Sequence, residues 1–190
     1  MDPKTLTVIS YICLLIISCY CFVEHVLEPQ SEIGTLSFAI MAFGAALCAI
    51  KTYDESLMPD ALKEAQKNVE IFSDSFVLSF AAAEVWEKQR VRMEVVIFQM
   101  LLPFLPIALY ISDKDYKKAL EYVILGSLIS FVTASILCFC ICGVLTAGIY
   151  AAGEFYVKDK VVLESVPQGD LKNYVNCLFC LFLLYTLDYV

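Results

Sequence analysis

The stretch Tyr122-Val-Ile-Leu-Gly-Ser-Leu-Ile-Ser-Phe-Val-Thr-Ala-Ser-Ile-Leu-Cys-Phe-Cys-Ile-Cys-Gly-Val-Leu-Thr-Ala-Gly-Ile-Tyr-Ala-Ala-Gly153 decides the fold class, because it contains no charged residue. A helix needs about 20 apolar residues, each rising about 1.5 Å, to cross the hydrocarbon layer of a membrane. Residues 122–153 therefore predict a membrane-spanning helix. The stretch is longer than one perpendicular crossing needs, so we expect the helix to tilt, to project beyond the bilayer, or to break near Gly143 or Gly148.

The composition of the whole chain agrees with a membrane environment. Of its 190 residues, 60% are hydrophobic and 18% are charged, whereas soluble domains have about 45–50% apolar and about 25% charged residues. The formal net charge is −8, and a nucleic-acid-binding or polybasic membrane-surface protein would have the opposite sign. We therefore expect an all-α integral membrane protein that binds no nucleic acid.

Other apolar runs predict the remaining spans of a single transmembrane domain over residues 1–190. Together with residues 122–153, the predicted spans of a four-helix bundle are residues 6–26, 33–50 and 95–111. A fifth span is expected at residues 171–190, although Asn173, Asn176 and Asp188 weaken its apolar character. A re-entrant or interfacial helix is the alternative for this last segment.

A helical loop over residues 52–93 is expected between the second and third spans. Its apolar residues recur in steps of three and four, which is typical of an amphipathic helix. The residues expected on its docking face are Val69, Phe72, Phe76, Phe80 and Trp86. This helix could pack on its own bundle, lie at the cytosolic interface, or dock a partner helix.

The placement of Lys and Arg predicts the orientation. Cytosolic loops of membrane proteins are enriched in these residues. Most of the 13 basic residues fall on the cytosolic side only if the N-terminus is also cytosolic. We therefore expect a multi-pass membrane protein with a cytosolic N-terminus and a cytosolic helical loop, in the endoplasmic reticulum or the plasma membrane.

Small side chains recur every four residues along residues 122–153. The stripe consists of Gly126, Ser130, Ala134, Cys138, Cys142 and Thr146, and Gly44 lies among similar residues in the second span. In lipid there is no hydrophobic force between helices, so small side chains matter because they let backbones approach closely. The stripe predicts tight packing within the bundle or against a partner subunit.

The third span contains the run Leu101-Leu-Pro-Phe-Leu-Pro106. Each proline lacks a backbone N–H and leaves a helix carbonyl unpaired. Pro103 and Pro106 therefore predict a kink, which either serves packing alone or shapes a groove for a lipid or a partner.

No residue pattern indicates catalysis, a cofactor or a metal. The single histidine, His25, is expected to be a solvated or hydrogen-bonded side chain at the end of the first span, and the nine cysteines are expected to pack as small apolar residues. No phosphate-binding or dinucleotide motif occurs. The cores of the first four predicted spans carry no charge, which argues against a proton-coupled transporter or a charge-lined channel made by this chain alone.

The sequence therefore predicts a protein that is not an enzyme and has no evident small-molecule substrate. The first expectation is a non-catalytic accessory or scaffolding subunit of a larger membrane complex, with membrane lipids and other integral membrane subunits as partners. The alternative is a lipid-binding, lipid-transfer or scrambling protein with a groove at the kinked third span. A channel or transporter subunit is the second alternative.

Overall fold

A computed structural model describes residues 2–27, 33–157 and 168–190, and all of its regular elements are helices. In chain order they are α1 (Pro3–Leu27), α2 (Ile33–Tyr53), η1 (Glu55–Leu57), α3 (Asp60–Lys88), α4 (Met93–Leu101), α5 (Phe104–Ile111), α6 (Lys117–Leu137), α7 (Ile141–Ala151), η2 (Ala152–Val157) and α8 (Gln168–Tyr189). The predicted all-α class is confirmed for the described residues.

Four helical segments are long and apolar enough to cross a membrane. They are Lys4–Leu27, Ile33–Tyr53, Met93–Ile111 and Lys117–Leu137, so α4 and α5 together make one of them. These segments fit a multi-pass membrane protein. Helix α8 is not among the four, and the fifth span at residues 171–190 stays a prediction.

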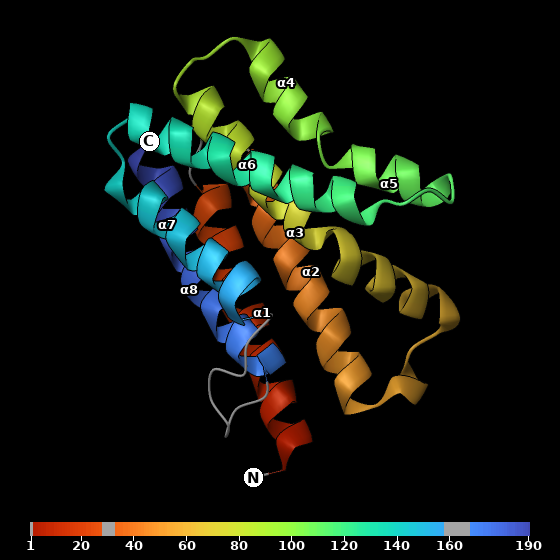
Figure 1. Ribbon diagram of the computed structural model, residues 1–190. Helices are drawn as coiled ribbons and strands as arrows, with labels where there is room; N and C mark the ends of the chain where they lie inside the picture. The colour runs from red at the N-terminus through yellow and green to blue at the C-terminus, as the bar shows by residue number, and fades with distance from the viewer. Residues whose placement is uncertain (1, 28–32, 158–167) are drawn as a thin grey trace.

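The helices close into a ring in which each contacts the next. The order around the ring is α1, α2, α3, α6, α7 and α8, and α8 returns to α1. Figure 1 shows α1, α2, α7 and α8 running along one another, with α6 lying across their upper end. Helices α4 and α5 pack outside the ring against α3 and α6.

The second half of α3 forms the centre of the molecule. Residues 77–85 are all buried, and the small residues 81–83 let the neighbouring helices approach closely. The Ser37 hydroxyl on α2 donates to the Val77 carbonyl at 2.9 Å. The sequence predicted this segment as part of a helical loop that could pack on its own bundle, lie at the cytosolic interface or dock a partner, and the structure packs it in the bundle. Its one acidic residue here, Glu84, finds partners inside.

Residues 122–153 are divided between two helices and the start of η2, so of the three alternatives that the sequence left open, a break is the one observed. Helix α6 ends at Leu137 and α7 begins at Ile141. The break is at Phe139, whose φ is 56°, and not at Gly143 or Gly148. The Phe139 N–H donates to the Ile136 carbonyl at 3.0 Å and the Cys140 N–H to the Ser135 carbonyl at 2.8 Å, which turns the chain out of the helix.

The third predicted span breaks once, although it contains two prolines. Helix α4 ends at Leu101 and α5 begins at Phe104, so Pro103 lies in the break. Pro106 lies in the first turn of α5. Backbone N–H groups in the first turn of a helix have no partner within that helix, so a proline there costs little.

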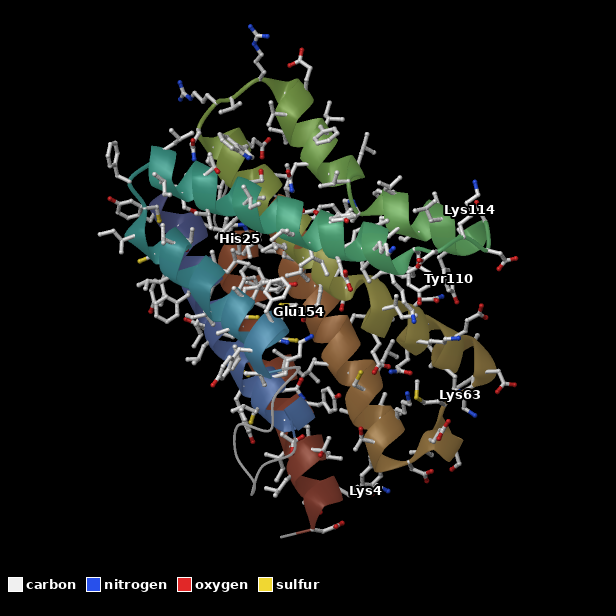
Figure 2. The ribbon with its side chains drawn as sticks, in the orientation of Figure 1. Lys4, His25, Lys63, Tyr110, Lys114 and Glu154 are labelled. Atoms are coloured by element: carbon white, nitrogen blue, oxygen red, sulfur yellow. The ribbon has the colours of Figure 1, made fainter. Side chains whose placement is uncertain are left out.

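A buried carboxylate joins four helices where α1 ends and α2 begins. Glu84 is fully buried, and His25 is 1% exposed. The His25 Nε2 atom lies 3.0 Å from Oε1 of Glu84, and Lys88 Nζ lies 3.5 Å from the same oxygen. The Gly34 N–H donates to Oε2 of Glu84, and Lys88 donates to the Leu187 carbonyl on α8. His25, labelled in Figure 2, was expected to be a solvated or hydrogen-bonded side chain, and the structure shows it buried and hydrogen-bonded to Glu84.

Gly34 makes room for this cluster at the N-terminus of α2. A Cβ atom on Gly34 would lie 2.7 Å from Cδ1 of Leu187 and 3.0 Å from Cδ of Glu84. The partial positive charge at a helix N-terminus also favours a carboxylate there. The absence of a side chain at residue 34 is therefore what lets Glu84 reach the backbone of α2.

We expect Glu84→Ala to lower the free energy of unfolding by about 3–5 kcal/mol, because it leaves His25 and Lys88 buried without their shared partner. Thermal unfolding in detergent micelles measures this loss. The matched control is Glu64→Ala, which removes an exposed carboxylate from the same helix. Equal unfolding midpoints for the two variants would show that the cluster does not hold the bundle.

Candidate functional site

A groove of about 570 Å³ runs between α4–α5 and α6, with α3 at one end. The α4–α5 wall is formed by Val95, Phe98, Leu102 and Leu105, and the α6 wall by Ala119, Tyr122, Val123 and Gly126. Almost all of this lining is apolar. Gln99, Trp86 and Ser130 complete the groove and supply its polar atoms.

The helix break at Pro103 positions one wall of the groove. Leu102 and Leu105, on either side of Pro103, both line the groove, whereas Pro103 and Pro106 are themselves buried. The opposite wall leaves open space at Gly126, where no atom lies within 4 Å of the position that a Cβ would take. The predicted kink therefore coincides with a lateral groove, and the neighbours of the prolines, not the prolines themselves, form its surface.

The polar groups beside the groove are bonded to one another. Gln99 Nε2 donates to the Ser127 hydroxyl at 3.0 Å, and that hydroxyl lies 2.7 Å from the hydroxyl of Ser79. Trp86 Nε1 donates to the Ser130 hydroxyl at 2.8 Å. These bonds tie α4 to α6 and α6 to α3, so they set the width of the groove. The bond to Ser130 also occupies the single N–H donor of the Trp86 side chain.

Most of the small residues that predicted a packing stripe pack inside this chain. Ala134 is fully buried, and the Thr146 hydroxyl lies 3.0 Å from that of Thr186. A Cβ on Gly44 would meet Val69 at 3.0 Å. Cys138 and Cys142 are half-buried near the α6–α7 break. The stripe is therefore divided between two helices, and its first members, Gly126 and Ser130, line the groove.

The residues expected on a docking helix are also covered by the chain itself. The Phe72 ring contacts that of Tyr110 with centroids 5.5 Å apart, and the Phe76 ring contacts that of Phe104 at 5.2 Å. Phe80 is buried beside Phe76. Val69 and Trp86 face Gly44 and Ser130, as described above. These contacts are with α2, α5 and α6 of the same chain, and a docked partner helix stays a prediction.

A second cluster of charges joins α3, η2 and α8. The Lys172 ammonium on α8 is 3.0 Å from Oδ2 of Asp74 on α3 and 2.7 Å from Oε2 of Glu154 in η2. Figure 2 labels Glu154 and His25, which mark the two clusters. Asp74 and Lys172 are 98 positions apart, so no local sequence pattern indicates that they pair.

Asp74 and Lys172 line two separate cavities. One, of about 250 Å³, lies among α1, α2, α3 and α8 and includes Tyr11, Asn173 and Asn176 in its lining. The other, of about 440 Å³, lies among α3, α6, η2 and α8. The charges come from α3, η2 and α8, none of which is among the four apolar spans. The cores of the first four predicted spans carry no charge, and these three residues lie outside those cores. The sequence therefore did not indicate a buried charged cluster.

Among the described residues, no group of three or more His, Cys, Asp or Glu side chains is placed to hold a metal ion. All nine cysteines are free thiols, and Cys140 uses its sulfur to accept the Gly143 N–H at 3.4 Å. The cysteine-rich run at residues 138–142 therefore serves the start of α7.

We expect Gly126→Ala to raise the free energy of unfolding by about 0.5–1 kcal/mol, because alanine favours the helix and the added methyl group meets only open space. Gly143→Ala is the contrasting variant. Its Cβ would lie 2.6 Å from that of Ser135, and overpacking costs about 1–3 kcal/mol. Thermal unfolding in micelles measures both changes. A loss of stability in Gly126→Ala equal to that in Gly143→Ala would show that the groove is closed at Gly126.

Comparison with known proteins identifies no relative. No family model, no curated protein and no solved structure matches this chain. Its function must therefore be inferred from the groove and the charged clusters themselves.

Proposed function

We propose that this multi-pass membrane protein binds a lipid acyl chain in the groove between α4–α5 and α6. The proposal rests on the two helical segments that form the walls of the groove. Both walls belong to segments that are long and apolar enough to cross a membrane, Met93–Ile111 and Lys117–Leu137. The medium beside an apolar groove of this kind is hydrocarbon, and acyl chains are its most abundant component.

The size and chemistry of the groove support an acyl chain. Its volume of about 570 Å³ falls within the range of about 300–1,000 Å³ that is typical of ligand sites. The Gln99 and Trp86 donors are directed to serine hydroxyls of the protein. A long apolar chain therefore fits this lining better than a polar solute does.

The expected binding is weak, for a physical reason. An acyl chain gains no hydrophobic free energy by leaving lipid, so only packing contacts and shape favour the groove. Weak, shape-dependent binding suits a protein that exchanges or passes lipid better than one that stores it.

The groove can be tested with a phosphatidylcholine that carries a photoreactive group in its acyl chain. We expect cross-links on α4, α5 and α6 after illumination in vesicles, and we expect Gly126→Leu to remove most of them by filling the groove. Mass spectrometry of the cross-linked peptides measures the yield.

The matched control is Gly148→Leu, because Gly148 is also exposed on an apolar helix, with open space where a Cβ would be, but lies outside the groove. We expect its yield to equal that of the unmodified protein. The proposal fails if both leucine variants cross-link as well as the unmodified protein.

The accessory or scaffolding function remains a proposal that native membranes can test. The sequence feature that suggested this function was a set of small residues, most of which pack within this chain. Co-purification of one integral membrane protein in fixed ratio, in mild detergent, would favour that function over lipid binding alone.

The charged cluster favours a channel or transporter as the second candidate. Charged residues inside a membrane bundle commonly mark pathways for ions or protons. Here Asp74 and Lys172 line cavities on both sides of the cluster. The excess of carboxylate over ammonium in the Asp74–Lys172–Glu154 group would favour a cation over an anion.

Transport can be tested in vesicles that hold a proton gradient or a sodium gradient. If the chain transports either cation, we expect Asp74→Asn to abolish most of the flux, because it removes the carboxylate that pairs with Lys172 and lines both cavities. Asp60→Asn, an exposed aspartate at the start of the same helix, should transport normally. No protein-dependent flux, or equal flux in both variants, would eliminate this candidate.

We further propose a cytosolic N-terminus, in the endoplasmic reticulum or the plasma membrane. The distribution of Lys and Arg along the chain supports this orientation. The packing of α3 weakens the support, because Lys88 lies beside His25 at the end of α1 and brings Arg90 and Arg92 close to that end of the bundle.

A further inference from the structure

In the part of the chain that the structure describes, three helices end in the same left-handed turn. The residues with positive φ are Arg90 after α3, Asp113 after α5 and Phe139 after α6, with φ values of 55°, 52° and 56°. The same pair of backbone hydrogen bonds closes each turn. The three turns therefore share one backbone geometry and differ in the side chains that they expose.

The α6–α7 turn exposes apolar side chains where the other two expose charges. Phe139 is 87% exposed, and its neighbours Leu137 and Ile141 are 60% and 75% exposed. A bulky apolar residue is disfavoured in the left-handed region, which suits glycine, asparagine and aspartate. Exposing Phe139 to water would add a second unfavourable contribution. A turn at a water-facing surface is therefore expected to have a residue such as Asp113.

Four backbone N–H groups of the α6–α7 turn have partners within the turn. The N–H groups of Cys138, Phe139 and Cys140 all donate to carbonyls of the last turn of α6, and the Gly143 N–H donates to Sγ of Cys140. The buried hydroxyl of Ser135, in the last turn of α6, donates to the Phe131 carbonyl at 2.8 Å. Hydrocarbon offers no partner to a polar backbone group, so these bonds within the protein lower the cost of placing the turn in lipid.

The two ends of the α6–α7 pair lie close together. Tyr116 and Lys117, at the start of α6, line the same cavity of about 440 Å³ as Glu154 and Phe155 in η2. Charged residues occur at both ends, and none occurs between residues 122 and 153. The apolar turn is thus the far end of a hairpin whose two polar ends meet.

We propose that the α6–α7 turn is inserted into the hydrocarbon layer of the membrane, so that α6 enters and α7 returns to the same membrane face. The occupant of the exposed apolar surface around Phe139 is lipid. The sequence alone predicted a helix over residues 122–153 that crosses once, which would place Lys117 and Glu154 on opposite faces. The proposal does not depend on the groove, which lies along another part of α6.

Tryptophan fluorescence tests this insertion directly. Phe139→Trp and Lys114→Trp are each made with Trp86→Phe, because Trp86 is the one native tryptophan. Lys114 is exposed in the polar turn between α5 and α6 and is labelled in Figure 2. Both variants are reconstituted in phosphatidylcholine vesicles with and without bromine atoms on the acyl chains.

We expect brominated lipid to quench most of the emission of the Phe139→Trp variant and little of that of Lys114→Trp. Aqueous iodide should have the opposite effect. Quenching of the Phe139→Trp variant by iodide overturns the proposal. Protection from both quenchers also overturns it, because protein rather than lipid would then cover the turn.

A stability measurement separates insertion from simple backbone strain. Asparagine adopts the left-handed conformation more readily than phenylalanine does. If the turn faced water, Phe139→Asn would raise the unfolding midpoint in vesicles. In hydrocarbon, its amide lacks a partner, and we expect the midpoint to fall. Arg90→Asn, at the equivalent position after α3, controls for the backbone effect and should not lower the midpoint.

Discussion

The carboxylate of Glu84 is the constraint on which the arrangement of this bundle depends. A buried charge is strongly unfavourable unless charged partners and hydrogen bonds surround it. Its partners come from the end of α1, the first turn of α2 and the next turn of α3, and Lys88 extends the set to α8. These helix ends must therefore converge on one point. Once α3 is fixed there, residues 77–85 necessarily lie in the centre of the molecule.

The position of α3 determines the rest of the site. Its Ser79 and Trp86 side chains meet the two serines that hold α6, and Gln89 donates to the Ala134 carbonyl one turn further along. Helix α4 is then joined to α6 through Gln99. The groove is what remains between the two outer segments after these bonds are made. Its width thus follows from polar contacts behind it, while its surface is left apolar.

Sequence reasoning succeeded where a property belongs to one segment and failed where it depends on two. Apolar runs located the four candidate spans, and Pro103 located the break between α4 and α5. The partnership of His25 with Glu84 spans 59 positions, and hydropathy does not report such pairings. A single histidine beside the end of an apolar run was the available signal. The break was predicted near Gly143 or Gly148, because glycine adopts a left-handed conformation easily, but it lies at Phe139. A left-handed turn can form at another residue when its surroundings compensate for the strain.

Helix α6 shows why the groove is expected to be preformed. Three hydrogen bonds hold one side of it to α3 and α4, so its position does not await a ligand. A groove that exists before binding requires no ordering of the protein when an acyl chain enters. Discrimination between lipids must then come from shape, above all from the open space over Gly126 and the bend at Pro103. A chain that follows this bend makes more contacts than one that cannot, and in hydrocarbon such contacts are the main source of preference.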